Sequence, residues 1–242
     1  MNNKHTDAVL SKWAGLGVSF QIDPAIGLID LERLILDAAR HASGMSRLFI
    51  MTTTWLHTYG DLIAKHRLKR LIRDELEDQY KPVLGLMLDI AQQGTHPLEF
   101  QTVIKDLKPA PEPRPLFDSA SKSNAMKQLA QRKATSVSKK WNLWCQENEF
   151  KHDAMRPSSW VIERFPELRT RADFRGDLRA SIIASLRYDP DSGQSESRLA
   201  QLAGGSRAQV RSALRNLELS GRVRSRPAPG SNRREIMLLD AG

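Results

Sequence analysis

The pattern of apolar and polar positions near the C-terminus predicts two helices joined by a tight turn. Two amphipathic segments lie between residues 195 and 226, and Gly204 and Gly205 separate them. Apolar residues then recur at helical spacing on one side of the second segment, at Val210, Ala213, Leu214 and Leu217. Ser206 stands where an N-cap is favoured, and Gly204 stands where a helix commonly ends. This order predicts a helix-turn-helix whose second helix covers residues 206–219.

The other face of that second helix is basic and carries small residues. At about 100° per residue, this face contains Ala208, Arg211, Ser212, Arg215 and Leu219, and Arg207 flanks it. Such a face is typical of a helix that lies in the major groove of DNA. We expect Arg207, Arg211 and Arg215 to meet base edges or phosphates. Ser206 and the amides beside it are expected to hold a phosphate at the helix N-terminus.

The flanking segments extend this pattern. Residues 222–226 and 233–239 read as two short strands around a turn rich in Pro, Gly and Asn, which predicts a hairpin. Upstream, residues 177–188 predict a first helix with Leu178, Ile182 and Leu186 on one face. The order of three helices and a hairpin, over residues 174–242, resembles a bacterial winged-helix DNA-binding domain. The hairpin would then be the wing, whose arginines grip flanking phosphates or enter the minor groove. These arginines are Arg222, Arg224, Arg226, Arg233 and Arg234.

A shorter resemblance lies just before this region. Residues 165–180 are similar to the lead-in of a group of bacterial winged-helix proteins, some of which are thought to be encoded beside nucleotidyltransferase genes, as toxin–antitoxin partners are. The matching positions are Pro166, Leu168, Arg169, Arg171, Ala172, Gly176, Arg179 and Ala180. The resemblance implies a bacterial regulator and, in a sharper form, an antitoxin.

The rest of the chain predicts helices. Residues 1–108 read as a helical bundle in which Asp30 caps one helix and Pro82 either begins a new helix or kinks a long one. Four prolines within residues 108–115 mark a stiff linker or an extended strap, and we place a Pro-rich linker at 109–123. Residues 124–173 would be a basic helical connector. This connector either lies along a phosphate backbone or is a bridging helix whose charged face is in contact with solvent. The expected fold class is mainly α, with an N-terminal helical bundle and a C-terminal winged helix-turn-helix that has a small β-hairpin wing.

Charge supports the assignment of DNA binding to the C-terminal half. Residues 1–118 carry 14 Lys and Arg against 15 Asp and Glu, a net charge of −1, whereas residues 119–242 carry 23 against 13, a net charge of +10. A polyanionic partner is therefore expected for the C-terminal half alone. The chain has no apolar run of about 18 residues, its N-terminus lacks the apolar core of a signal peptide, and it has a single cysteine. These features predict a cytoplasmic protein without a membrane span.

No motif predicts an enzyme. The chain lacks a phosphate-binding loop, a dinucleotide-binding fingerprint and a nucleophile elbow, and its histidines have no metal-ligand spacing. Cys145, in an apolar stretch, reads as a packed thiol rather than a nucleophile. The acidic run at 74–78 either faces solvent or pairs with the basic cluster at 66–70. We therefore expect no catalytic residue, no metal and no cofactor.

Two hypotheses of different classes follow. The first is a sequence-specific regulator that binds double-stranded DNA, in the form of a repressor, with helix 206–219 in the major groove and the wing at 222–239 on the flanking backbone. In this hypothesis the N-terminal bundle forms a homodimer or binds a partner. The second is an antitoxin or protein-interaction module whose bundle binds a protein such as a toxin, with DNA binding only for autoregulation.

Overall fold

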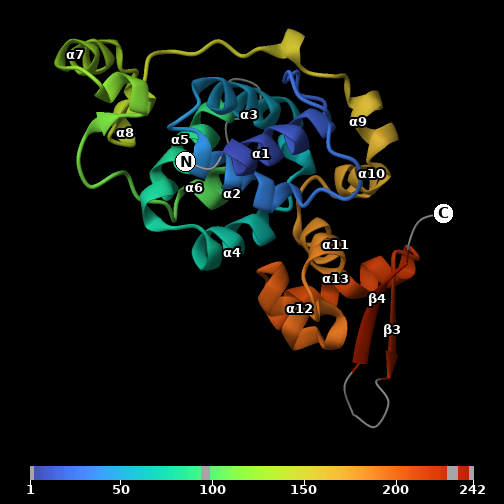
Figure 1. The fold of residues 1–242 in the computed structure, drawn as a ribbon. Coiled ribbons are helices and arrows are strands. Elements are labelled where there is room, and N and C mark those ends of the chain that lie inside the picture. Colours follow the sequence, from blue (N-terminus) through green and yellow to red (C-terminus); the bar gives the residue numbers. More distant parts are fainter. Residues whose placement is uncertain (1–2, 94–98, 228–233, 240–242) are drawn as a thin grey trace. The chain divides into compact units, whose positions relative to one another are not determined.

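The computed structural model describes residues 3–93, 99–227 and 234–239, and this part of the chain is mainly helical. A small antiparallel two-stranded sheet lies near the C-terminus (Figure 1). This coarse class was predicted from the sequence. The described residues contain no helix that combines the length and the apolar character needed to cross a membrane.

The chain forms two compact units. The N-terminal unit comprises Met1–Gly60 and Glu75–Phe165, and the C-terminal unit comprises Asp61–Asp74 and Pro166–Gly242. From the sequence, residues 1–108 were expected to form one domain, and the last domain was expected to begin at residue 174. The structure thus assigns a segment from the first third of the chain to the C-terminal unit.

The N-terminal unit is built from eight α-helices and two short strands within its described residues. They are α1 (Asn3–Gly15), α2 (Leu31–His41), α3 (Ser46–Tyr59), α5 (Lys81–Ala91), α6 (Gln101–Ile104), β1 (Arg114–Pro115), α7 (Asn124–Lys133), α8 (Ser136–Lys140), β2 (Leu143–Trp144) and α9 (Ser158–Arg164), together with Glu75, the last residue of α4 (Lys65–Glu75). Helix α5 is buried on nearly every side, as expected of a helix that is apolar all round, and it packs against α2, α3, α6 and α8. The predicted N-cap Asp30 and the predicted helix start at Pro82 are both confirmed.

The proline-rich stretch is an anchored strap and not a free linker. Strand β1 pairs in parallel with β2, and the amides of Ala110 and Leu116 donate to the carbonyl oxygens of Trp141 and Trp144, each at 3.1 Å. Ala110 and Leu116 are buried. Proline spacing alone does not distinguish the two alternatives, because both are extended. The partner segment, residues 141–144, was predicted to be helical, and instead it is a turn followed by β2.

Gly85 allows Trp141, which lies in the segment that pairs with the proline-rich strap, to pack against α5. A Cβ at this position would overlap the indole ring of Trp141, so glycine in the middle of α5 allows the ring to lie against the helix backbone. The Trp141 Nε1–H donates to Asp89 Oδ2 at 3.0 Å, which satisfies its buried polar atom. The chain from residue 110 to residue 145 therefore belongs to the N-terminal unit.

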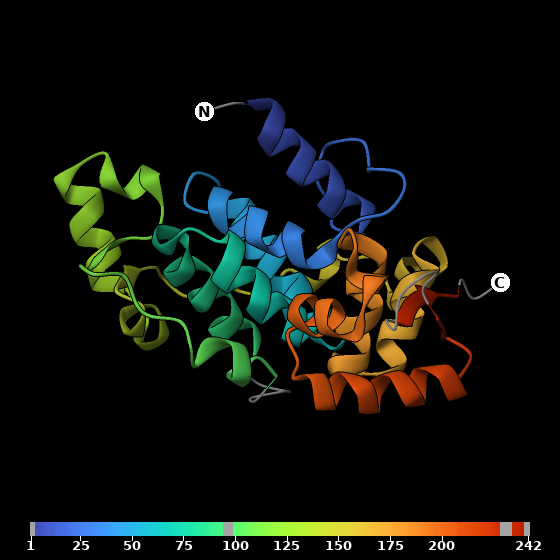
Figure 2. The same cartoon turned by 90° about the horizontal axis from the view of Figure 1, so that it is seen from below.

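The C-terminal unit contains α10 (Pro166–Asp173), α11 (Leu178–Tyr188), α12 (Glu196–Ala203), α13 (Arg207–Leu219), β3 (Val223–Pro227) and β4 (Arg234–Leu238), with most of α4. Its core is apolar and is formed by Ile182, Ile183, Leu199, Ala200, Ala203, Val210, Leu214, Leu217, Val223 and Ile236. Figure 2 shows α13 (orange-red) along the edge of this unit, with its neighbouring helices on one side only. One long face of α13 is thus left to solvent.

Candidate nucleic-acid interface

Local signals in the sequence set the geometry of α12, the turn and α13. Ser195 caps α12 by accepting the amide of Arg198 at 3.1 Å, and α12 ends at Gly204, whose φ is +78°. The amides of Gly204 and Gly205 both donate to the carbonyl of Ala200, at 3.1 and 3.2 Å. This left-handed glycine with paired amide bonds is a common way to end a helix. The predicted turn and the predicted N-cap Ser206 are confirmed.

Gly204 is also required by a close approach of two backbones. A Cβ at this position would overlap the carbonyl oxygen of His66 on α4, whereas a Cβ at Gly221, which has a similar φ of +67°, would meet nothing. We therefore expect Gly204→Ala to lower the free energy of unfolding of the C-terminal unit by about 1–3 kcal/mol more than Gly221→Ala, because both carry the left-handed strain but only one overpacks. Hydrogen exchange in α11–α13 measures both. Equal losses would mean that α4 does not approach the turn.

Helix α13 has a buried and an exposed face, as the spacing predicts. Val210, Leu214 and Leu217 are buried in the core. On the opposite side, Arg207, Ala208, Arg211, Ser212 and Arg215 are all exposed. The arginines at 207 and 215 have no ion pair among the described residues, so their guanidinium groups are available to a ligand.

Ser206 is used differently from the prediction. Its hydroxyl accepts the amide of Gln209 at 3.3 Å, and its own amide donates to Gln209 Oε1 at 3.0 Å, which completes a capping box. The hydroxyl and the amide of Ser206 are therefore engaged within the helix. Ser206 fixes the start of α13, and an incoming phosphate would have to displace the Gln209 side chain to reach its amide.

Arg211 is oriented by a carboxylate. Its Nε and Nη2 atoms donate to Glu196 Oε2 at 3.1 and 3.0 Å, on the first residue of α12. The Arg211 side chain remains about half exposed. Glu196 thus occupies one edge of the guanidinium and leaves Nη1 without a partner among the described residues. The role of Glu196 was not predicted from the sequence, because the pair joins residues 15 positions apart on two helices.

The hairpin arginines divide into three groups. Arg224 is exposed on β3, with no ion pair among the described residues, and Arg226 pairs across the strands with Glu235, with Nε 2.8 Å from Oε2. Arg222 departs from the prediction: it is half-buried and donates to Thr170 Oγ1 at 3.0 Å and to Asp173 Oδ2 at 3.4 Å, so it attaches the base of the hairpin to α10. Arg233 lies outside the described residues, and Arg234 is exposed at the start of β4.

A basic groove of about 590 Å³ joins the start of α12, the first turns of α13 and the start of β4. Four arginines line it, together with the single carboxylate Glu196; they are Arg198, Arg207, Arg211 and Arg234. Sequence reasoning missed Arg198, because on α12 alone it reads as one solvated charge. The groove concentrates positive charge where three elements meet, which suits an extended polyanion.

Two buried arginines of α4, Arg67 and Arg70, share the carboxylate of Asp189. Arg67 donates from Nε and Nη2 to the two carboxylate oxygens of Asp189, both at 3.0 Å, and Arg70 Nη2 donates to Asp189 Oδ2 at 2.9 Å. Arg67 is fully buried and Asp189 nearly so. Arg70 Nε also donates to the carbonyl of Leu202 on α12. Two residues of the basic cluster at 66–70, Arg67 and Arg70, therefore bind Asp189.

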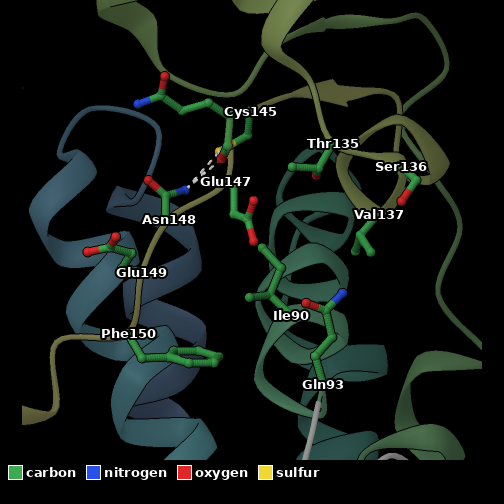
Figure 3. Close-up of a pocket in the computed structure, with 11 residues that line it drawn as sticks. Ile90, Gln93, Thr135, Ser136, Val137, Cys145, Glu147, Asn148, Glu149 and Phe150 are labelled. Carbon is green, nitrogen blue, oxygen red and sulfur yellow. Dashed lines mark hydrogen bonds between the residues drawn. The ribbon is translucent and has the colours of Figure 1, made fainter.

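A separate pocket of about 370 Å³ lies in the N-terminal unit and includes Cys145 (Figure 3). Burial raises the pKa of the Cys145 thiol, and Asn148 Nδ2 donates to its sulfur at 3.1 Å. A thiol with a raised pKa is a weak nucleophile at neutral pH. Among the described residues, no three His, Cys, Asp or Glu side chains are grouped to hold a metal ion. The Cys145 thiol is thus not activated by its surroundings in this pocket.

No protein-family model, no curated protein and no solved structure matches this chain.

Proposed function

We propose that this chain is a sequence-specific regulator that binds double-stranded DNA, and that its C-terminal unit is a winged helix-turn-helix. The observation that carries the proposal is the two-sided character of α13. Its apolar stripe is buried, and its free face carries Arg207, Arg211 and Arg215 among small residues. A basic helix with small side chains suits the major groove, where arginine reads guanine through two hydrogen bonds.

The surroundings of α13 support this orientation. Helices α11, α12 and α13 precede an antiparallel hairpin, which is the element order of a winged helix. The basic groove beside α13 would take one strand of the backbone, while Arg224 and Arg226 on the hairpin would contact the flanking phosphates. In this arrangement, the arginines that contact the DNA backbone and those that read bases lie on the same unit.

The two groove-facing arginines have different contacts in the free protein. Arg211 is held by Glu196, which presents it in one orientation, whereas Arg215 has no ion pair among the described residues. Arg215 therefore has both terminal nitrogens available for a bidentate contact with guanine. We assign base reading mainly to Arg215. Occupying an operator requires nothing more than such site-specific binding, so the regulator is proposed as a repressor.

Duplex binding by the full chain is expected to weaken steeply with salt. Each phosphate that is neutralised releases counterions, with a slope of about −0.9 per contact, so about five to eight contacts give a log–log slope of roughly −4 to −7. Fluorescence anisotropy with a selected duplex, at a series of salt concentrations, measures this slope. Arg73→Ala is the matched control, because Arg73 is exposed on α4 and bonded to Asp74. Its slope should equal that of the wild type.

The same measurement tests the alternative. An interaction module that binds a partner protein and uses DNA only for autoregulation would still bind its own operator with salt dependence. A module that binds protein alone would show a slope near zero or no duplex binding at low salt. Either of those last two results would overturn the proposed function.

A further inference from the structure

A second basic surface lies in the N-terminal unit, on α7 and α8. Residues 119–146 contain six Lys and Arg and no Asp or Glu. Helix α7 is capped by Ser123, whose hydroxyl accepts the amide of Met126 at 3.2 Å, and α8 is capped in the same way by Thr135. Figure 1 shows the two helices next to each other, α7 in green. Both helices are therefore defined elements and not a charged tail.

Helix α7 contributes no buried residue. At about 100° per residue, Lys127, Gln128, Gln131 and Arg132 fall on one side of the helix. Met126 and Leu129 fall on the other side, and they are 45% and 39% exposed. The basic side thus combines cations with side-chain amides and contains no apolar anchor.

Some of the cations elsewhere in the unit are paired with carboxylates. Arg33, Arg40 and Lys81 each form ion pairs with nearby carboxylates. In contrast, no ion pair of Lys127, Arg132, Lys133 or Lys139 exists among the described residues. Lys140 is the exception, because its Nζ lies 2.6 Å from Asp89 Oδ2. A group of like charges without carboxylates repels itself, and a polyanion would relieve that repulsion.

We propose that α7 and the start of α8 form a second DNA-binding surface, which contacts the phosphate backbone of a duplex without reading its sequence. The choice of ligand rests on the proposed function of the C-terminal unit. Backbone contacts require cations and amide donors, which this side of α7 supplies. A protein interface of useful affinity needs buried aromatic or apolar anchors, and the basic side of α7 has none. The surface therefore favours nucleic acid over an acidic protein.

The first test removes the two charges of this side of α7 in the full chain. We expect the variant K127A/R132A to bind both a selected and a random duplex about tenfold or more weakly at about 0.1 M salt, and to have a salt slope that is about 1–2 less negative. Its preference for the selected duplex should be unchanged. Alanine is a strong helix former and the positions are exposed, so the helix is expected to persist. Circular dichroism verifies this.

The matched control removes the same charge from exposed positions elsewhere in the N-terminal unit. K105A/K108A should keep the affinity and slope of the wild type, because these lysines lie outside α7 and α8. Equal losses in the two double variants would show only a general effect of net charge and would overturn the proposal. Wild-type binding by K127A/R132A would also overturn it.

A second measurement separates this proposal from the proposed function. A photo-crosslinking residue at Gln128 should crosslink to a bound duplex, and the same residue at Gln101, also exposed in this unit, should not. Crosslinking at Gln128, in a chain whose site preference survives Arg215→Ala, would support this surface and refute the reading role of α13. Loss of preference on Arg215→Ala without crosslinking at Gln128 would do the reverse.

Discussion

Replacing Asp189 with asparagine is expected to destabilise the C-terminal unit by about 3–5 kcal/mol, because it leaves two buried arginines without their carboxylate. Arg67 and Arg70 both donate to this side chain, and Arg67 is fully buried. Asparagine keeps the shape of aspartate and one acceptor oxygen, but it supplies no negative charge. The loss in free energy of unfolding therefore measures the cost of leaving the two arginine charges uncompensated, and not the cost of creating a cavity.

The measurement must distinguish the two units. All five tryptophans lie in the N-terminal unit, so tryptophan fluorescence in urea follows that unit, while hydrogen exchange in α11–α13 follows the C-terminal unit. Asp191→Asn is the matched control, since Asp191 is exposed two residues away and asparagine tolerates its left-handed φ of +61°. It should change the stability by less than about 0.5 kcal/mol. A loss as small as this in Asp189→Asn would mean that the α4 arginines are not held by Asp189.

Replacing Arg215 with alanine is expected to remove about 1–3 kcal/mol of discrimination between the preferred duplex and random DNA, the value of one good bidentate contact. Arg215 lies on the exposed face of α13 and has no ion pair among the described residues. In the proposed complex it meets base edges in the major groove. Binding to the preferred duplex should therefore fall much more than binding to the random duplex. Both are measured at one fixed salt concentration.

Arg224→Ala provides the comparison within the same unit. Arg224 is exposed on β3, where contacts go mostly to the backbone and carry little sequence information. We expect it to lower the affinity for both duplexes by similar factors. Equal losses on the two duplexes in Arg215→Ala would contradict the placement of α13 in the groove, and a loss of preference in Arg224→Ala would mean that the hairpin reads bases.

Local signals predicted the part of the fold that local chemistry determines. Gly204, Ser206 and the stripe of Val210, Leu214 and Leu217 each act within a few residues, and the structure places all of them as expected. The exposed face of α13 follows from the same spacing. This is why the predictions for α12, α13 and the hairpin strands were the most accurate, while the function of their exposed arginines stays a prediction.

Contacts between distant residues were not predictable in this way. Nothing near Arg67 in the sequence indicates that its partner is Asp189, and a basic cluster next to an acidic run suggests a nearer pairing. The proline-rich strap became part of the N-terminal unit through its pairing with residues 141–144, which no local pattern indicates. Arg222 was read as a wing residue because its partners, Thr170 and Asp173, lie about 50 positions away.

The contribution of α4 to the C-terminal unit has a consequence for synthesis on the ribosome. Asp189 follows Arg67 by 122 residues, so at about 5–20 residues per second roughly 6–24 s pass before the acid exists. During that interval the nascent chain carries a helix whose two arginines lack the carboxylate of Asp189. The contacts of Arg67 and Arg70 with Asp189 thus form only after all residues of the N-terminal unit, which ends at Phe165, have been synthesised. A stalled or prematurely terminated chain would leave α4 accessible to chaperones and proteases.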